Sequence, residues 1–390
     1  MESIRDKVAI IGMGCSKFGE RWDADMFDLM VEAAYEAYED ARIDPKQIQA
    51  AWYGTCYSAM TGMPLAEALK TEYIPVTRVE DVCCTATQAF INASCAVAAG
   101  VYDIALAIGV EKLKDQGLTG LIGPAEETGT LAPGSAPAMF ALAAVRYAHH
   151  YGIKIDDLRK ALAQISVKNH HNGTFSPKAH FQREITLEQA LNAPIIAWPL
   201  GLFDCCGTSD GSAAAIITRP EIARKFRDDY VLLKGFGLAT GAKQGQLQSR
   251  YDFVHFPENV ASSKMAYAQA GIKDPLNEID HAIVHDCFTI TELIIYEDFG
   301  FSPRGKGIDD VNAGTFALNG KLAVNTDGGL KCFGHPVGAS GLRMVYEVYK
   351  QLQGKAGQRQ RKNPRFGMTH NLGGAPGKFT CAITILGRKD

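Results

Sequence analysis

Several patterns that would assign a function quickly are missing from this sequence of 390 residues. No two of its ten cysteines form a C-x-x-C pair, which argues against a zinc ribbon or a thioredoxin-type redox motif. No segment is apolar over the length that spans a bilayer, and the first residues lack the apolar core of a signal peptide. A net charge of -3 argues against general attraction to nucleic acid or acidic membranes. We therefore expect a cytoplasmic protein whose partners include neither nucleic acid nor a membrane.

Motifs for cofactors and metals are equally scarce. Gly12-Met13-Gly14 lacks the third glycine of the dinucleotide-binding fingerprint. The pairs His149-His150 and His170-His171 lack the helical spacing of metal ligands, and we expect them on solvated surface. Residues 204–211 are typical of a tight turn into a buried strand, with structural rather than catalytic roles. We expect no metal and no permanently bound cofactor.

The chain is longer than the size at which one hydrophobic core stops growing, so two lobes are expected. An internal repeat agrees, because residues 41–54 and 270–285 each follow a helical pattern, contain an Asp-Pro turn and lead into an apolar strand. This alternation predicts an α/β fold of two pseudo-symmetric βαβαβ halves packed in layers, with mostly parallel sheets. We place the N-terminal half at residues 1–225 and the C-terminal half at residues 226–390.

The repeat continues into the segments that carry chemistry. Cys83 and Gly334-His335 each stand before a helical stretch, at 86–100 and 339–352, that runs into a strand. The halves differ by a long interruption from about 112 to 204, rich in Gly, Pro, Ala and His, which we expect to be an inserted loop region over the site. If a pseudo-twofold axis relates the halves, the two helix N-termini converge and the histidine reaches the thiol as its base.

Cys83 is the candidate nucleophile because it stands at the start of a helix. Free amides and the positive end of the helix dipole favour a thiolate there and lower its pKa. The amide of Cys83 would itself point toward a developing oxyanion. Cys84 is adjacent and points in a different direction, so only one of the two thiols can serve. The alternative is that both are small apolar residues that pack the helix.

His285-Asp286-Cys287-Phe288 follows an apolar strand, at the edge where open α/β sheets place their ligand crevices. His285 is a candidate donor to a substrate carbonyl oxygen, and Cys287 is a candidate for exchanging a proton with a carbanion. Asp286 is expected to be a structural hydrogen-bonding group, and the alternative for His285 is a satisfied core histidine. Residues 370–377 follow another strand, and their glycines either let amides approach an oxyanion or end the strand in a turn.

Together these segments resemble the thiolase superfamily over essentially the whole chain, in particular the branch of sterol-carrier-protein thiolases and archaeal-type acetoacetyl-CoA thiolases. Val79-Glu80-Asp81-Val82-Cys83 is similar to the family's nucleophile segment, a register that favours Cys83 over Cys84. The motif at 285–288 is the hallmark of this branch, where other thiolases carry Asn-Glu-Ala-Phe. The family usually has small residues with a glycine directly after the nucleophile. Cys84-Thr85-Ala86 departs from this pattern, so we expect an unusual acyl pocket.

The resemblance implies a role for each candidate residue. Asn371 stands where other thiolases have their second catalytic cysteine, so Cys287 would take over that acid/base duty. His335 would activate Cys83 and share an oxyanion hole with His285.

A second oxyanion hole would use the amides of Cys83 and Gly374, in the segment that contains Asn371. The implied mechanism is ping-pong: Cys83 attacks a 3-oxoacyl-CoA, the C–C bond breaks, the departing enolate is protonated, and coenzyme A, a substrate, takes the acyl group. The resemblance also implies a homodimer formed through the N-terminal half and a small accessory subunit with a zinc ribbon and an OB-like domain.

For the substrate we favour degradative cleavage of a bulky or aromatic 3-oxoacyl-CoA such as benzoylsuccinyl-CoA. The unusual Cys-Cys-Thr-Ala turn and the Gln-rich composition support this choice. The alternative is condensation of two acetyl-CoA units to acetoacetyl-CoA. A retro-aldol lyase with the same fold and a non-catalytic acyl-binding protein also stay open, although neither needs two cysteines and two histidines together.

Overall fold

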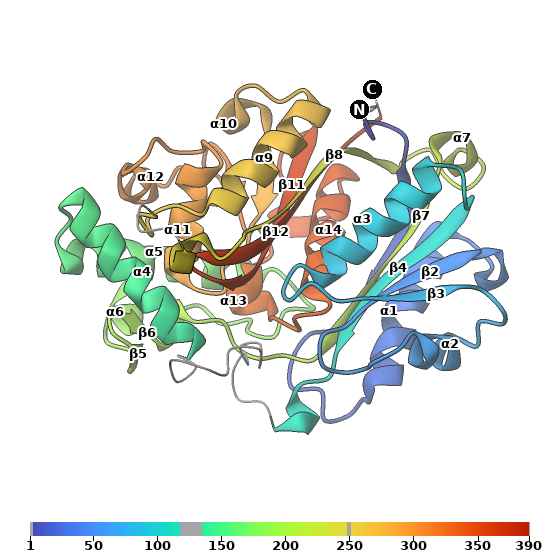
Figure 1. Cartoon of the computed structure of the whole chain (residues 1–390), viewed down its shortest axis with the longest axis horizontal. Helices are drawn as coiled ribbons and strands as arrows, with labels where there is room; N and C mark the ends of the chain where they lie inside the picture. The colour runs from blue at the N-terminus through green and yellow to red at the C-terminus, as the bar shows by residue number, and fades with distance from the viewer. Residues whose placement is uncertain (1–2, 118–134, 248–250, 390) are drawn as a thin grey trace.

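The computed structural model describes residues 3–117, 135–247 and 251–389. The strands of the N-terminal half are β1 (Ala9–Cys15), β2 (Ala50–Gly54), β3 (Val76–Val79), β4 (Ile104–Glu111) and β7 (Gly211–Thr218). Those of the C-terminal half are β8 (Val231–Thr240), β9 (His281–Ile283), β10 (Ala323–Val324), β11 (Phe366–Ala375) and β12 (Lys378–Gly387). These ten form one sheet in the order β10-β9-β11-β12-β8-β1-β7-β4-β2-β3 (Figure 1).

Helices cover this sheet. Those of the N-terminal half are α1 (Met26–Ala41), α2 (Met63–Leu69), α3 (Thr85–Ala98) and α7 (Pro220–Ala223). Those of the C-terminal half are α8 (Gln244–Leu247), α9 (Pro257–Ala270), α10 (Pro275–Glu278), α11 (Thr289–Asp298), α12 (Gly307–Asn312), α13 (Gly329–Phe333) and α14 (Ser340–Leu352). Short 3-10 turns occur at 45–47, 114–116, 202–204 and 357–359.

The two halves of the sheet mirror each other. From the outer edge inward the strands run β3-β2-β4-β7-β1 in one half and β10-β9-β11-β12-β8 in the other, and antiparallel β1 and β8 join them. This confirms the two pseudo-symmetric halves. The prediction of mostly parallel sheets is wrong, because only β2 with β3 and β4, and β9 with β10 and β11, pair in parallel. The chain returns directly from β11 into β12, so these two strands are antiparallel. β7 is likewise antiparallel to β4.

Helices α1 and α3 lie on opposite faces of the N-terminal half. Ala9 and Ile11 of β1 share a hydrophobic core with the buried face of α1, whereas Ile10 and Met13 share the main core with Phe90 of α3. Alternate residues of a strand point to opposite faces, so β1 is buried on both sides and its sequence is apolar throughout. In the C-terminal half, α9 packs on β8 and β12, and α14 packs on β11.

The helices α3 and α14 pack against each other where the halves meet. A Cβ on Gly341, in the first turn of α14, would lie only 2.2 Å from Thr87 Oγ1 of α3. A Cβ on Gly109 of β4 would lie 2.1 Å from the carbonyl oxygen of Gly338. Because these glycines permit such close approach, the residues directly before the two helices reach a common point.

The interruption after β4 is largely helical in its described part. It contains α4 (Ala136–Tyr151), α5 (Ile155–Thr174), α6 (Leu187–Leu191) and the hairpin of β5 (Ile195–Ala197) and β6 (Leu200–Gly201), while residues 118–134 lie outside the described residues. The expected loop region is therefore mainly a helical insertion.

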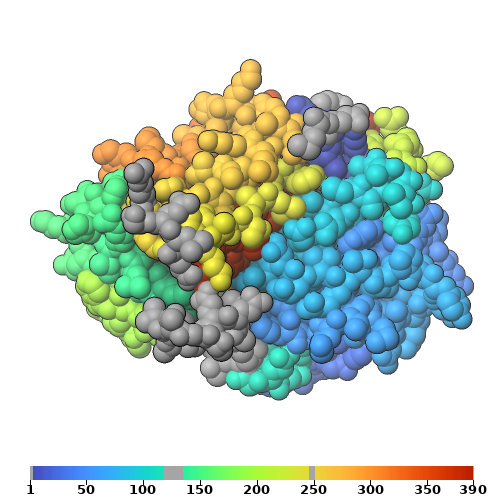
Figure 2. Space-filling model, in the orientation of Figure 1, coloured from blue at the N-terminus to red at the C-terminus, as the bar shows by residue number. Residues whose placement is uncertain are grey.

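The insertion is helical because its apolar residues recur at helical spacing and give a helix an apolar face. Leu158, Leu162 and Ile165 of α5 join the main core, and α5 packs on α11 and α13. In Figure 2 the insertion, in green, lies beside the C-terminal half, with the blue N-terminal half on the other side. Within the described ranges, no helix combines the length and apolar character needed to cross a membrane.

Candidate active site

Cys83 lies in a tight turn between β3 and α3. Val82 before it has a φ of 49°, a left-handed conformation that β-branched residues rarely adopt. The Thr85 hydroxyl stabilises this turn, because it accepts a hydrogen bond from the Asp81 amide at 2.8 Å and donates one to the Val82 carbonyl at 2.6 Å. The constrained turn fixes the direction in which the Cys83 thiol points.

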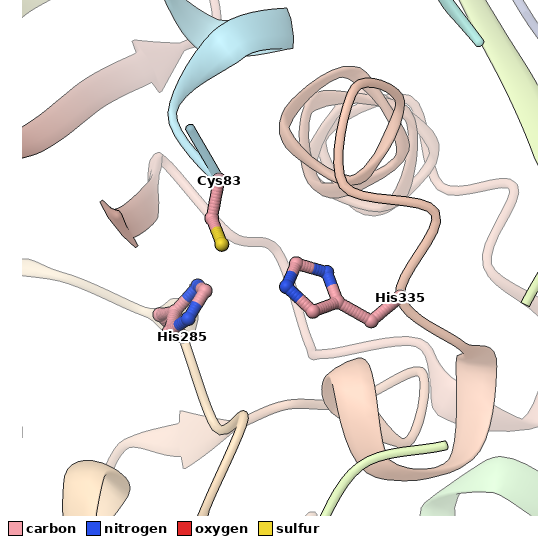
Figure 3. A group of neighbouring side chains, drawn as sticks. All are labelled: Cys83, His285 and His335. Atoms are coloured by element: carbon pink, nitrogen blue, oxygen red, sulfur yellow. The ribbon is translucent and has the colours of Figure 1, made fainter. Parts of the chain in front are cut away.

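The thiols of Cys83 and Cys84 have different surroundings. Cys84 Sγ lies 3.3 Å from the carbonyl oxygen of Asn371, so it is tied to the main chain of β11. Cys83 Sγ and one ring nitrogen from each of His285 and His335 lie within 4.8 Å of one another. Figure 3 shows the sulfur pointing between the two rings. The fold therefore brings three of the predicted catalytic side chains together and turns Cys84 away from them.

The hydrogen bonds of His335 fix which ring nitrogen carries the proton. Its Nδ1 lies 2.8 Å from Ser340 Oγ, and that hydroxyl donates its hydrogen to the Pro336 carbonyl at 2.9 Å. Because a serine hydroxyl has one hydrogen, it must accept the bond from Nδ1–H. Nε2 then holds the lone pair, and it has no hydrogen-bond partner among the described residues. His335 thus presents a free base inside the site.

His285 lies just after β9 and is buried. Its Nδ1 has no hydrogen-bond partner in the described part of the chain, and its main-chain N–H donates to Nδ1 of His370 at 3.3 Å. The rings of His285 and His335 meet edge to face, with centroids 5.3 Å apart. Burial and the neighbouring His335 hold the pKa of His285 well below its usual value. It is therefore a neutral imidazole at pH 7 that can donate one hydrogen bond.

Burial decides the charge state of the nucleophile and its base. It raises the pKa of the Cys83 thiol to about 12, with a further contribution from Asp81 and Glu80. Burial, together with Arg343, lowers the pKa of His335 to about 3. The prediction that the helix N-terminus lowers the thiol pKa is therefore wrong, because desolvation outweighs it. The resting pair is a neutral thiol and a neutral imidazole, so the proton moves when the sulfur attacks. A metal ion bound at this position would require Cys83 to be deprotonated.

Cys287 reaches the same region from the start of α11. Its Sγ lies 3.7 Å from Thr291 Oγ1, and burial and the nearby thiols of Cys206 and Cys83 raise its pKa well above the usual value. Cys206 is held there because its amide donates to the Cys287 carbonyl at 2.8 Å. The sequence did not single out Cys206, which stands in the segment predicted to be a structural turn. Three thiols thus surround the reacting centre.

The glycine that approaches Cys83 is Gly373. A Cβ there would lie 2.9 Å from Val82 Cβ and 3.0 Å from the Cys83 amide nitrogen. Gly374 follows with a φ of 109° and is exposed. Asn371 is buried, and its Oδ1 accepts a hydrogen bond from Thr87 Oγ1 at 2.7 Å. The double glycine was the signal for this segment, but only the structure shows which glycine faces the nucleophile.

Two other polar residues from the sequence motifs, Asp286 and His170, are held in structural hydrogen bonds. Asp286 accepts hydrogen bonds from the amides of Leu330 and Lys331 and from Asn169 Nδ2, so its carboxylate holds α13. The prediction of a solvated surface is wrong for His170, which is buried with Nδ1 3.0 Å from the Arg183 carbonyl.

Around the thiol of Cys83 the contacts are apolar. Leu113 and Val337 are buried against it, and the partly buried Cys56 and Val82 complete the cluster. The site therefore combines two buried thiols, Cys83 and Cys287, with two buried imidazoles, which are the kinds of group that acyl transfer through a thioester needs.

Two family models match the chain: the thiolase N-terminal domain over residues 8–221 and the thiolase C-terminal domain-like model over residues 239–388. An acetyl-CoA acetyltransferase of Methanothermobacter thermautotrophicus is 36% identical over 98% of this chain and 99% of its own length. The benzoylsuccinyl-CoA thiolase subunit BbsB of Thauera aromatica is 31% identical over 94% of this chain and 95% of its own.

Sterol carrier protein 2 of Oryctolagus cuniculus is 31% identical over 94% of this chain and 70% of its own length. Among solved structures, a complex titled Ltp2-ChsH2(DUF35) aldolase has a TM-score of 0.83 at 24% identity over 99% of both chains, which shows the shared fold. These matches confirm the resemblance to sterol-carrier-protein-type thiolases. The chain is an acyltransferase that belongs to the thiolase family.

Proposed function

We propose that the protein cleaves a 3-oxoacyl-CoA with coenzyme A, or runs the reverse Claisen condensation, through an acyl group on Cys83. The observation that carries this proposal is the grouping of Cys83 Sγ with ring nitrogens of His285 and His335 within 4.8 Å. His335 adds an unpartnered, buried Nε2 lone pair, which is the base that a neutral thiol needs.

In the first half-reaction, His335 Nε2 takes the thiol proton while Cys83 Sγ attacks the 3-oxo carbon. We assign the oxyanion to the amides of Cys83 and Gly374; the neighbouring Gly373 supports this, because a Cβ there would lie 3.0 Å from the Cys83 nitrogen. The bond between C2 and C3 then breaks, and its electron pair leaves as the enolate of a shorter acyl-CoA. His285 donates to the enolate oxygen.

In the second half-reaction, the proton of the Cys287 thiol passes to the enolate carbon, and the shorter acyl-CoA leaves. The thiol of coenzyme A gives its proton to the Cys287 thiolate and attacks the thioester on Cys83. The released Cys83 sulfur takes back the proton held by His335. Coenzyme A enters as a substrate, and every group of the protein returns to its starting state.

Two observations bear on the acyl group of the substrate, and they support different substrates. Similarity to BbsB supports a bulky or aromatic acyl group, as in benzoylsuccinyl-CoA. The higher identity to an acetyl-CoA acetyltransferase and the aliphatic side chains of Leu113 and Val337 beside the thiol support acetoacetyl-CoA. A retro-aldol lyase has little support, because the aldolase likeness lies in the fold alone and an aldol cleavage needs no thiol nucleophile.

Partners and location are also proposals. BbsB is named as a subunit, and the aldolase structure is titled as a complex containing a DUF35 protein. These names support a small accessory subunit with a zinc ribbon and an OB-like domain, next to a homodimer in the cytoplasm, as the resemblance implies.

The test is mass spectrometry of the protein after brief exposure to acetoacetyl-CoA, linear 3-oxoacyl-CoA and an aromatic 3-oxoacyl-CoA, with any co-purifying subunit retained. We expect an adduct on the peptide that contains Cys83, with a mass that names the acyl class. Cys83→Ala should abolish the adduct, whereas the matched control Cys84→Ala should keep it, because that thiol faces the Asn371 carbonyl. Equal labelling of wild type and Cys83→Ala would refute the proposal.

A further inference from the structure

Resting on the function proposed above, we infer that His370 is a positioning residue for His285, and that Asn259 and Asp298 hold His370 in the one tautomer that can do this. None of the three belongs to the set that carries the chemistry. These residues are joined by a continuous chain of hydrogen bonds, which begins at the His285 main chain and ends at Arg304 on the surface.

The first link stands where the ladder between β9 and β11 stops. That ladder pairs residues 281–283 with residues 367–369, so His370 is the next residue of β11 beyond it. The amide of His285 donates to the His370 ring, with Nδ1 as acceptor at 3.3 Å. A side chain thus supplies the bond where the strand pairing ends, and the direction of the chain at His285 depends on it.

The second link fixes the proton on the His370 ring. Its Nε2 lies 3.0 Å from Asn259 Oδ1, and Asn259 Nδ2 donates to Asp298 Oδ2 at 3.0 Å. A carboxylate only accepts, so the Asn259 amide cannot be turned round, and its oxygen faces the ring. Nε2 must then carry the hydrogen and Nδ1 the lone pair, which is what the amide of His285 requires.

The outer end of the chain is anchored by charge. Asp298 is buried, accepts the Phe256 amide at 3.0 Å and pairs with Arg304, whose side chain is 41% exposed. The His370 ring is held from the side by Phe299, edge to face with centroids 4.8 Å apart. Burial also lowers the pKa of His370 to about 3, so the ring stays neutral and its Nδ1 stays an acceptor.

The consequence is a division of labour between the histidines. His335 acts on the Cys83 proton, and its geometry depends on Ser340 and not on His370. His285 acts on the enolate oxygen, and its geometry depends on His370. Loss of the His370 acceptor should therefore impair C–C chemistry while the thiol keeps its reactivity.

Two substitutions separate positioning from simple packing. His370→Phe fills the space but offers no acceptor, whereas His370→Asn places an oxygen near the position of Nδ1. We expect His370→Phe to lower kcat for 3-oxoacyl-CoA cleavage by about tenfold to hundredfold, the size of effect that misplaced catalytic groups produce. The rate of Cys83 alkylation by iodoacetamide should stay within about twofold of wild type, since His335 is untouched. His370→Asn should recover most of kcat.

A second measurement does not need turnover. With ¹⁵N-labelled histidine, NMR should show His370 as the Nε2–H tautomer in the wild-type protein, and the His285 amide signal should shift in His370→Phe far more than in His370→Asn. This result would stand even if no 3-oxoacyl-CoA were cleaved, in which case only the proposed function would fail. An Nδ1–H tautomer, or cleavage by His370→Phe at the wild-type rate, would overturn the inference. So would equal losses of cleavage and alkylation in both variants.

Discussion

The N-terminal half of the molecule supplies Cys83, and the C-terminal half supplies Cys287 and the imidazoles. Cys83 lies just before α3 (Thr85–Ala98), and His335 lies in the segment that leads into α14 (Ser340–Leu352). The sequence holds no histidine before residue 149, whereas His285, His335 and His370 all follow residue 226. In the function proposed above, one duplicated framework is divided between a nucleophile in one half and its base in the other, and both lie where α3 packs on α14.

The loops after β2 and β9 show the same division. Cys56 and Cys287 lie at matching places in these loops, because each is six residues beyond the first residue of its strand. The loop of Cys56 is closed by the buried carboxylate of Glu111, which accepts hydrogen bonds from the Tyr57 amide and the Ser58 hydroxyl. The loop of Cys287 is held by the Cys206 amide, which donates to the Cys287 carbonyl. Both Cys56 and Cys287 have Cys83 as a neighbour. A buried carboxylate thus holds the loop in one half, and a main-chain hydrogen bond holds the matching loop in the other.

The largest expected effect on the reactivity of Cys83 follows from removing the proposed base in the C-terminal half. His335→Ala should slow alkylation of Cys83 and acylation by a 3-oxoacyl-CoA by about 10²- to 10⁴-fold, the range for loss of a general base. Ser340→Ala keeps the imidazole but frees its tautomer, so we expect a loss nearer tenfold. Iodoacetamide labelling followed over time measures both. Labelling of His335→Ala at the wild-type rate would show that another group takes the proton.

The matched cysteines test whether the halves really differ in chemistry. Cys287→Ala should still accept an acyl group on Cys83 but should lose C–C cleavage by about 10²-fold or more, because the enolate has no proton donor. Cys56→Ala should leave the ratio of cleavage to acylation unchanged. Single-turnover measurements of both steps give that ratio. If the two variants changed it alike, Cys287 would have no special role.

A smaller effect is expected from the close approach of β11 to the nucleophile. Gly373→Ala introduces a Cβ 2.9 Å from Val82 Cβ and 3.0 Å from the Cys83 nitrogen. We expect a loss of about 1–3 kcal/mol in the free energy of unfolding, as for other overpacked sites, together with slower acylation. Urea unfolding and acylation kinetics check this, with Gly354→Ala as a control, because a Cβ there meets nothing within 4 Å, although its φ of 74° gives it a strain of its own.

The pH dependence of stability should also follow the C-terminal half. Burial lowers the pKa of six histidines, four of them in that half: His170, His180, His281, His285, His335 and His370. Each binds a proton on unfolding below its ordinary pKa of 6.5, so each destabilises the folded protein as the pH falls from 6.5 toward about 4.

Five carboxyl groups oppose this, because burial raises the pKa of Asp286 to about 7, that of Asp298 to about 6, and those of Asp81, Glu111 and Asp327 above their usual values. The histidines outnumber them, and each net proton changes the unfolding free energy by about 1.4 kcal/mol per pH unit. The urea midpoint should therefore fall between pH 7 and pH 5. A midpoint that rose over this interval would contradict the balance.

The sequence was sufficient for what local pattern controls. The repeat, the helices after Cys83 and His335, and the thiolase resemblance could all be predicted, because an Asp-Pro turn or a Gly-His-Pro segment is visible in a few consecutive residues. The antiparallel pairing of β4 with β7 could not, since the insertion separates these two strands in the chain. The raised pKa of Cys83 was also missed, because burial depends on everything packed around it. The positions of Cys206 and His370 were missed because they depend on hydrogen bonds to residues far away in the chain.

The helical insertion has a consequence for how the chain folds. In the C-terminal half, β11 and β12 are joined by a turn at Pro376 and Gly377, so their pairing closes a very short loop. In the N-terminal half, β4 and β7 must find each other across residues 112–210. Each doubling of a loop costs only about 0.6 kcal/mol in closure entropy, but contacts distant in sequence form slowly. We therefore expect the half that carries the bases to fold first and to offer β8 as a template on which the thiol-bearing half is completed.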